Sequence, residues 1–173
     1  FAPNASYRLA GAPCEGVVGH QERIYPHGVT ARFPNGELVA KLRAGAEYSI
    51  TQMFFEVDDY LRLRDRVAAV DPEQGAKPII PGLMPITSLR TVTRQVELSG
   101  SQIPPQPLAR LPRAAGQGPE ENRDEVRKIG IELATEMSRR LIAEGAPCLH
   151  FCTLNFARAT SEVLANLGMT VAV

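Results

Sequence analysis

The sequence predicts an α/β fold built on a parallel β-sheet. From Gly36 onward, short segments rich in β-forming residues alternate with longer amphipathic segments of helical period. The short segments are nearly continuous in apolar residues, which is typical of strands buried on both faces of a parallel sheet. Recurring strand–helix units of this kind indicate right-handed crossover connections.

The first expected elements are a helix, a strand and a second helix. Residues 37–43 have helical patterning, and Gly45 suits a helix C-cap. Residues 48–55 are rich in β-formers, which predicts a strand. From Val57, apolar residues recur at helical spacing opposite charged ones. This pattern predicts an amphipathic helix that ends before the Asp71-Pro72 break.

The remaining elements repeat the same alternation. Residues 78–85 are too short and apolar for a surface helix and predict a buried strand. Thr87 or Ser88 is expected to cap a helix that extends to about Leu98. The longest helical pattern covers 120–144. Its buried stripe is expected at Ile129, Leu133, Met137 and Leu141. A last strand at 148–154 and a last helix at about 157–167 complete the pattern.

Composition narrows the classes of function. Nineteen Lys and Arg against nineteen Asp and Glu give zero net charge, so no excess positive charge is available for nucleic acid or an anionic membrane. Three cysteines, at 14, 148 and 152, form no CxxC motif, and Cys148 and Cys152 are expected to be packing residues. No long apolar segment and no signal-peptide pattern is present, although the chain begins with Phe1 and is expected to be incomplete. These features indicate a cytoplasmic protein.

The kind of α/β fold follows from motifs that the sequence lacks. Neither GxGxxG nor GxxxxGK[ST] occurs, which disfavours a doubly wound nucleotide-binding fold. A (β/α)8 barrel is the other common option, but it needs eight strands and about 250 residues. We therefore expect a partial (β/α)8 TIM barrel comprising roughly the last three to four strand–helix units. It would occupy residues 36–173, and residues 1–35 are an unplaced segment, either aberrant or a remnant of an earlier unit.

Three blocks carry a resemblance to a known family: AGAEYSITQMFF at 44–55, PIIPGLMP at 78–85 and LHFCTLN at 149–155. In this order they resemble the last three barrel strands of 5,10-methylenetetrahydrofolate reductase, from about residue 36 to the C-terminus. The resemblance implies reduction of 5,10-methylenetetrahydrofolate to 5-methyltetrahydrofolate by NAD(P)H through FAD, in one-carbon metabolism and methionine biosynthesis. It also implies a homo-oligomer. The flavin would carry the hydride chemistry, and the protein would supply orientation and electrostatics.

The resemblance also assigns residues to the site. Gln52 matches a strand-borne glutamine that holds the pterin, and its amide can donate and accept at once; the alternative is a glutamine bonded to nearby backbone. Thr91 lies near a position that contacts folate, although a threonine in such a helix is usually a packing residue. Lys41 matches a lysine near the flavin phosphate or ribityl group, and Glu37 matches a polar flavin-side residue. An ordinary solvated lysine is the alternative for Lys41.

Two departures from the family pattern concern the last strand. Cys152 stands where the family often has tyrosine, and Phe156 stands where it often has an arginine that meets the folate carboxylate or pterin side. Either Arg158 substitutes for that arginine from the next turn, or the affinity for substrate is lower. His150 is expected to donate to a backbone carbonyl, and no spacing indicates a metal site.

The resemblance places the carboxylic acid that protonates the folate nitrogen on the first strand of the barrel. No catalytic residue is therefore expected in this chain, and we expect little or no reductase activity from it alone. Two other hypotheses remain open. One is a non-enzymatic partial barrel that self-associates through its open sheet edges. The other is a complete small α/β domain that binds some other phosphate ligand.

Overall fold

The computed structural model describes residues 6–8, 21–22, 36–99, 109–111 and 122–169. Within these ranges the centre of the fold is a five-stranded sheet of order β1-β5-β4-β3-β2. The strands are β1 (Ser6–Arg8), β2 (Gln21–Glu22), β3 (Ser49–Met53), β4 (Ile79–Leu83) and β5 (Cys148–Phe151). β2 through β5 are parallel, and β1 pairs antiparallel with β5.

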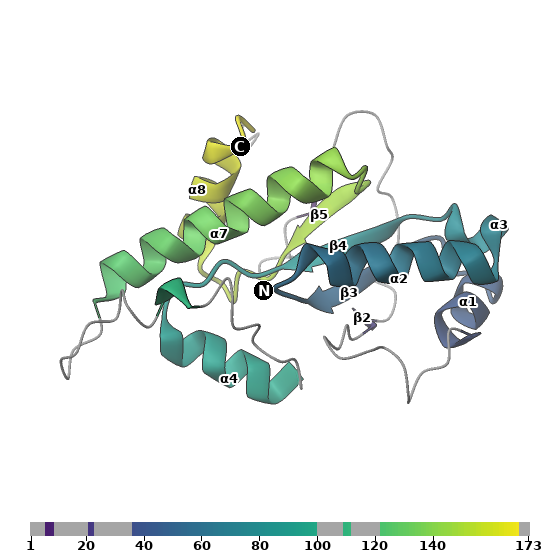
Figure 1. The fold of residues 1–173 in the computed structure, drawn as a ribbon, viewed down its shortest axis with the longest axis horizontal. Coiled ribbons are helices and arrows are strands. Elements are labelled where there is room, and N and C mark those ends of the chain that lie inside the picture. Colours follow the sequence, from purple (N-terminus) through teal and green to yellow (C-terminus); the bar gives the residue numbers. More distant parts are fainter. Residues whose placement is uncertain (1–5, 9–20, 23–35, 100–108, 112–121, 170–173) are drawn as a thin grey trace.

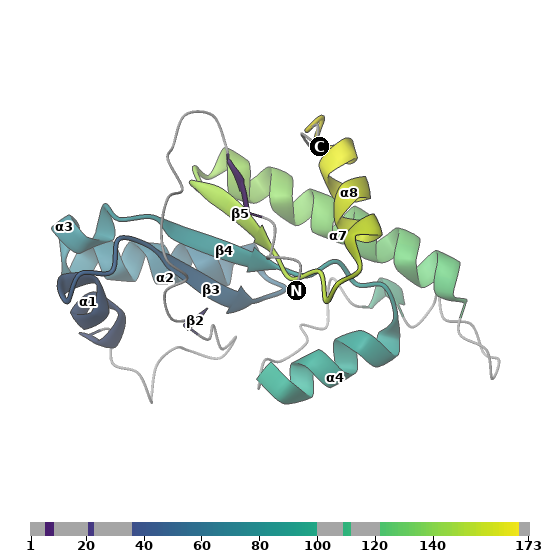
Figure 2. The ribbon, with the colours of Figure 1, turned by 180° about the vertical axis from the view of Figure 1, so that it is seen from behind.

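Six helices accompany this sheet in the described ranges. They are α1 (Gly36–Arg43), α2 (Val57–Val70), α3 (Pro72–Gly75), α4 (Leu89–Ser99), α7 (Arg123–Ala143) and α8 (Ala157–Asn166). Figure 1 shows α2 and α7 in front of the sheet, and Figure 2 shows both behind it, so they cover the same face. α4 and α8 lie at the carboxyl ends of the strands, whereas α1 and α3 lie at the amino ends.

The three strands expected from the sequence are confirmed, and they lie side by side in the parallel order β3-β4-β5. The helices expected between them are confirmed as well, with bounds that differ by at most a few residues. The described residues form an open sheet rather than a closed barrel, so the partial barrel stays a prediction. β1 and β2 come from the segment that the sequence pattern left unplaced.

The main core lies between the sheet and the two covering helices. From β4, Ile79 and Leu83 point into it, and α2 contributes Tyr60, Leu63 and Val67. The hydroxyl of Tyr60 donates to the carbonyl oxygen of Ile79 at 2.8 Å, so this buried polar group is satisfied. This core fixes the direction of the strands and hence the place where their carboxyl ends meet.

The buried face of α7 is wider than the sequence predicted. Leu133 and Leu141 are buried as expected, but Ile129 and Met137 are only half-buried. The difference comes from small residues that bring the helix close to its neighbours. A Cβ atom on Gly130 would lie 1.9 Å from the carbonyl oxygen of Ile86, so α7 contacts the segment after β4 through its backbone.

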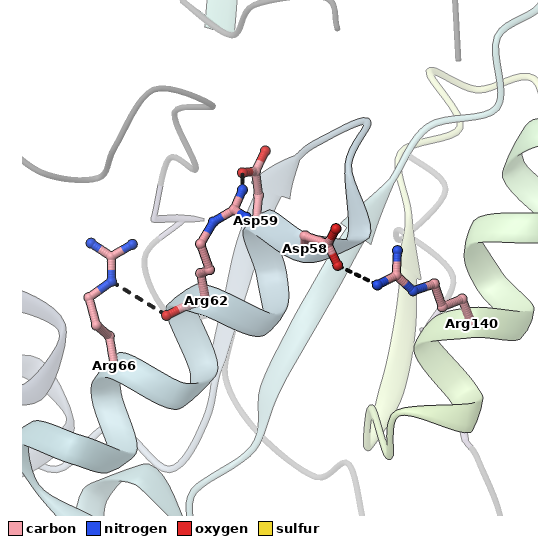
Figure 3. Close-up of polar contacts among 5 residues, drawn as sticks. All are labelled: Asp58, Asp59, Arg62, Arg66 and Arg140. Carbon is pink, nitrogen blue, oxygen red and sulfur yellow. Dashed lines mark hydrogen bonds and ion pairs between the residues drawn. The ribbon is translucent and has the colours of Figure 1, made fainter. Parts of the chain in front are cut away.

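Charged side chains connect the outer surfaces of α2 and α7. Figure 3 shows Arg140 of α7 paired with Asp58 of α2, and Arg62 paired with Asp59 on the same helix. The Asp58–Arg140 pair is about half exposed on both sides. Exposed ion pairs typically contribute about 1 kcal/mol or less to the free energy of unfolding, so this charged surface adds little to stability.

Two expectations about β5 need correction. Cys148 packs in the core beside Ile50 and Ile80 as expected, but it is also disulfide-bonded, which the sequence did not predict, whereas Cys152 is free. His150 is buried, and neither ring nitrogen has a hydrogen-bond partner in the described part of the chain, so it does not donate to a carbonyl there. Burial lowers the pKa of His150 and favours the neutral ring.

Candidate functional site

A pocket of about 270 Å³ opens at the carboxyl ends of β4 and β5. Its walls come from the segments that follow these two strands and from α4 and α8. It is lined by Met84, Pro85, Thr87, Arg90, Thr91, Arg94, Cys152, Thr153, Leu154, Phe156, Ala159 and Thr160. In parallel α/β folds, ligands bind where the carboxyl ends of adjacent strands meet. The pocket is therefore the candidate functional site.

Two contacts fix β4 and the segment that follows it. The backbone N–H of Gly82 donates to the hydroxyl of Thr51 at 2.9 Å, and a Cβ atom on Gly82 would lie 2.4 Å from the Thr51 carbonyl oxygen. Only glycine allows β3 and β4 to approach this closely. The side chain of Ser88 then accepts from the backbone N–H of Thr91 at 3.1 Å, which confirms Ser88 as the expected helix cap.

The wall after β5 contains a sharply bent segment. Leu154 and Asn155 have φ angles of 49° and 67°, a left-handed conformation that is rare outside glycine. The backbone N–H of Phe156 donates to the carbonyl oxygen of Thr153 at 2.8 Å and closes the turn. The bend leaves the Phe156 ring 74% exposed at the pocket. Consecutive left-handed residues of this kind cluster at ligand sites.

Helix α8, which forms another wall, is tied to α7 by an ion pair. Nη2 of Arg127 lies 2.6 Å from Oε1 of Glu162. The hydrogen bond from Arg127 lowers the pKa of the Glu162 carboxyl group, and the same contact raises the pKa of Arg127. Glu162 also accepts from Arg158, at 3.3 Å. The middle of α8 is thereby held against α7.

The pocket has an asymmetric charge. Arg90 and Arg94 of α4 line it, and no aspartate or glutamate is among its lining residues. Neither arginine has an ion-pair partner among the described residues. Both are exposed at their helix surface and lie one turn apart. The pocket is therefore positively charged at neutral pH.

Two further side chains give the pocket its hydrogen-bonding character. Thr160 is buried, and its hydroxyl has no partner in the described ranges. Burial raises the pKa of the Cys152 thiol, so the thiol stays protonated at neutral pH. A protonated thiol is a poor nucleophile, and Cys152 is better suited to contact a ligand than to attack one.

The structure brings one of the four predicted site residues to the pocket. Thr91 lines it, and its hydroxyl oxygen accepts from Ser88 at 2.8 Å. Gln52 lies at the same edge of the sheet, near the end of β3, but outside the pocket lining. Its Oε1 accepts from the backbone N–H of Met53 at 3.0 Å, which is the backbone-bonded alternative raised by the sequence.

The two residues expected at the flavin lie elsewhere. Lys41 is in the last turn of α1, and Glu37 is near its beginning. The carbonyl oxygen of Leu42, next to Lys41, accepts from Lys77 just before β4, so this end of α1 lies at the amino ends of the strands. Figure 1 likewise shows α1 at the opposite end of the sheet from α4 and α8.

Sequence reasoning missed the arginine pair and the unpaired Thr160 hydroxyl. The signal for Arg90 and Arg94 was present, because they are i, i+4 neighbours in a helix that follows a buried strand. No pattern signalled Thr160. Its position depends on how α8 packs against α7.

The fit of FAD to this arrangement can be judged from the pocket itself. Its volume of about 270 Å³ is just below the range of ligand pockets, roughly 300–1,000 Å³. The residues expected at the flavin do not lie among its walls. The described residues therefore do not assemble a cradle for a dinucleotide. They also contain no group of three His, Cys, Asp or Glu side chains that would hold a metal ion.

Comparison with known proteins decides the family. The family model for methylenetetrahydrofolate reductase matches residues 20–168. The chain belongs to this family. The matched range includes every residue that lines the pocket.

Several curated relatives agree with this assignment. Methylenetetrahydrofolate reductase 1 of Schizosaccharomyces pombe is 35% identical over 157 residues, covering 90% of this chain and 24% of that protein. The Escherichia coli 5,10-methylenetetrahydrofolate reductase is 30% identical, covering 84% and 47%. A probable NADPH-dependent member from Caenorhabditis elegans is 36% identical, covering 76% and 19%. The chain thus spans less than half the length of these relatives.

A solved structure shows a weaker similarity. It is an uncharacterized protein from Clostridium thermocellum that binds two copies of 5-methyl-5,6,7,8-tetrahydrofolic acid. It aligns at 16% identity with a TM-score of 0.49, covering 78% of this chain and 48% of that chain. At this score the likeness does not establish a common fold.

No helix in the described part of the chain is long and apolar enough to cross a membrane.

Proposed function

We propose that this chain binds reduced folate in the reaction that converts 5,10-methylenetetrahydrofolate to 5-methyltetrahydrofolate. The observation that carries the proposal is the pocket at the carboxyl ends of β4 and β5, in a chain that matches the reductase family over residues 20–168. The place of the pocket is where parallel α/β folds hold their ligands.

The lining of the pocket suits a folate. Threonine hydroxyls, including that of Thr91, can bond polar ring atoms. Phe156 offers an exposed aromatic face for a flat ring. The positive charge of the arginines suits an anionic ligand. Gln52 would contribute the pterin contact after its amide leaves the Met53 N–H, because both lie at the same sheet edge.

The cofactor and the reductant belong to the same proposal. When bound, FAD would supply the hydride chemistry of the reaction, with NAD(P)H as the reductant. We derive no step of this chemistry from the pocket, because its residues do not form a flavin cradle. The roles of Lys41 and Glu37 at the flavin, a cytoplasmic location and homo-oligomerisation are likewise proposals. No described pocket residue is a carboxylic acid, so none can serve as the folate proton donor.

Calorimetric titration of the purified chain with 5-methyltetrahydrofolate tests the proposal. We expect saturable binding that Thr91→Val weakens by about 2–10-fold, the loss of one hydrogen bond. Thr93→Val is the matched control, because Thr93 lies on the same helix outside the pocket lining and its replacement should leave the affinity unchanged. A folded chain that shows no saturable binding would overturn the proposal. The absorption spectrum of the purified protein separately shows whether flavin is retained.

A further inference from the structure

The loop between β5 and α8, residues 153–156, gathers exposed apolar side chains at the pocket. Leu154 is 45% exposed and Phe156 is 74% exposed, and both line the pocket. Among the described residues, Val70 on α2 is the one other large apolar side chain that is comparably exposed. Figure 2 shows the loop where the chain turns from β5 into α8. An exposed aromatic ring beside a cavity has apolar surface that it would bury by turning into that cavity.

The backbone of this loop is strained. Leu154 and Asn155 have φ angles of 49° and 67°, and the left-handed conformation is unfavourable for residues with a Cβ atom. One hydrogen bond closes the turn, from the backbone N–H of Phe156 to the carbonyl oxygen of Thr153 at 2.8 Å. Two strained residues in succession store free energy that a change of loop conformation would release.

Both ends of the loop are held firmly, whereas its middle is not. Before the loop, the backbone N–H of Cys152 donates to the carbonyl oxygen of Leu83 at 2.8 Å. After the loop, Ala159 and Thr160 of α8 are buried. Between these points Phe156 is the N-cap residue of α8, and its side chain makes no capping hydrogen bond. The loop can therefore change conformation without breaking a helix cap, while β5 and α8 stay in place.

We propose that residues 153–156 form a lid that closes over the pocket. In the closed form Leu154 and Asn155 leave the left-handed region, and the Phe156 ring turns from solvent into the pocket. Release of strain and burial of the ring favour closure, whereas ordering of the loop and loss of its turn hydrogen bond oppose it. A ligand shifts this balance toward the closed form, because it gives the ring a surface to pack against. The lid does not depend on which ligand the pocket binds.

A single fluorescent reporter tests the lid in the ligand-free chain. The sequence contains no tryptophan, so Phe156→Trp places one indole on the loop. Closure is measured as a fall in the rate constant for quenching by acrylamide, obtained from fluorescence lifetimes. Two substitutions of the exposed Asn155 are added to this variant. Asn155→Gly favours the left-handed, open loop, and Asn155→Ala favours the closed one. We expect quenching about twofold slower with Asn155→Ala than with Asn155→Gly.

Titration with 5-methyltetrahydrofolate provides the second part of the test. At saturation the indole should be protected from acrylamide in every lid variant. By calorimetry, Asn155→Ala should bind roughly 2–5-fold more tightly than Asn155→Gly, because more of it is already closed. Val70→Trp on α2 is the control, because Val70 lies outside the pocket lining and its indole should be quenched equally with and without ligand.

The outcomes separate the lid from the proposed function. Saturable binding that leaves the indole unprotected would overturn the lid and leave the proposed function intact. No binding, together with slower quenching of Asn155→Ala than of Asn155→Gly in the free chain, would support the lid and overturn the proposed function. Equal quenching of the two Asn155 variants in the free chain would overturn the lid whether or not the ligand binds.

Discussion

Arg127 on α7 lies 2.6 Å from Glu162 on α8, and this ion pair fixes the helix that forms one wall of the pocket. The pair is more than a surface contact, because the Arg127 side chain is only 26% exposed. Glu162 lies within one turn of Ala159 and Thr160, the α8 residues that line the pocket. The shape of the site thus depends on a contact outside it.

Weakening this pair should reduce stability in a pH-dependent way. The pKa of Glu162 is lowered in the folded chain, so its stabilising effect is present above the unfolded value of about 4.3 and is lost as the pH falls below that value. Because the pair is partly exposed, its contribution to the free energy of unfolding should be about 1 kcal/mol or less. Urea denaturation of wild type, Glu162→Gln, Arg127→Gln and the double variant at pH 7 should give a coupling energy of this size. A coupling energy of zero would contradict it.

Gly130→Ala should destabilise the chain strongly. The added Cβ would meet the carbonyl oxygen of Ile86 at 1.9 Å, and backbone atoms cannot yield as a flexible side chain can. Overpacking of this kind typically costs about 1–3 kcal/mol and occasionally more. Thermal unfolding measures the loss. Gly45→Ala is a useful comparison, because Gly45 has a positive φ but open space around it, and only the conformational cost should appear. Similar losses for both variants would argue against the close α7 contact.

Tyr60→Phe should lower stability at neutral pH by about 0.5–1.5 kcal/mol, because the Ile79 carbonyl loses its donor. Burial also raises the pKa of Tyr60 to about 12. The contribution of Tyr60 is therefore present below pH 10 and is lost as the pH rises from about 10 to about 12. The stability difference between wild type and Tyr60→Phe, measured by denaturation at pH 8 to 11, should shrink with rising pH. A difference that stays constant would mean that Tyr60 ionises freely in the folded chain.

Phe156→Ala should weaken the binding of 5-methyltetrahydrofolate. The ring is exposed in the free chain, so its removal costs little stability but takes away an aromatic surface for the ligand. Aromatic contacts contribute about 0.5–1.5 kcal/mol beyond their buried area, which predicts a loss of roughly 2–10-fold in affinity. Phe156→Leu should recover only part of the loss. Unchanged affinity in Phe156→Ala would place the ligand away from this wall.

The sequence predicted the three central strands, β3, β4 and β5, because they are short segments rich in apolar and β-forming residues, but it did not predict β1 and β2. The strand at 78–85 and the Ser88 cap are examples, since both depend on local chemistry alone. The buried face of α7 was predicted less well. Its outline depends on the close approach of Gly130 to Ile86, a contact between residues far apart in the chain.

In the candidate site, too, features that depend on local sequence were predicted better than features that depend on contacts between distant residues. Thr91 was found through family resemblance, and the structure places it in the pocket. The side chain of Gln52 points to its own neighbour instead, which no pattern could show. The place of Arg90 and Arg94 in the pocket could not be predicted from the sequence, because it depends on the packing of α4 beside the carboxyl ends of β4 and β5. Arg158 is the opposite case. It is close to Phe156 in sequence, but it does not line the pocket.

NMR can locate the bound folate directly. Threonine methyl resonances of the full chain are followed during titration with 5-methyltetrahydrofolate. Saturable shifts are expected for the pocket threonines Thr87, Thr91, Thr153 and Thr160. Thr93 and Thr135, which lie outside the pocket lining, should not shift. Saturable shifts confined to threonines outside the pocket, or no shifts in a folded chain, would contradict the assignment of this pocket as the folate site.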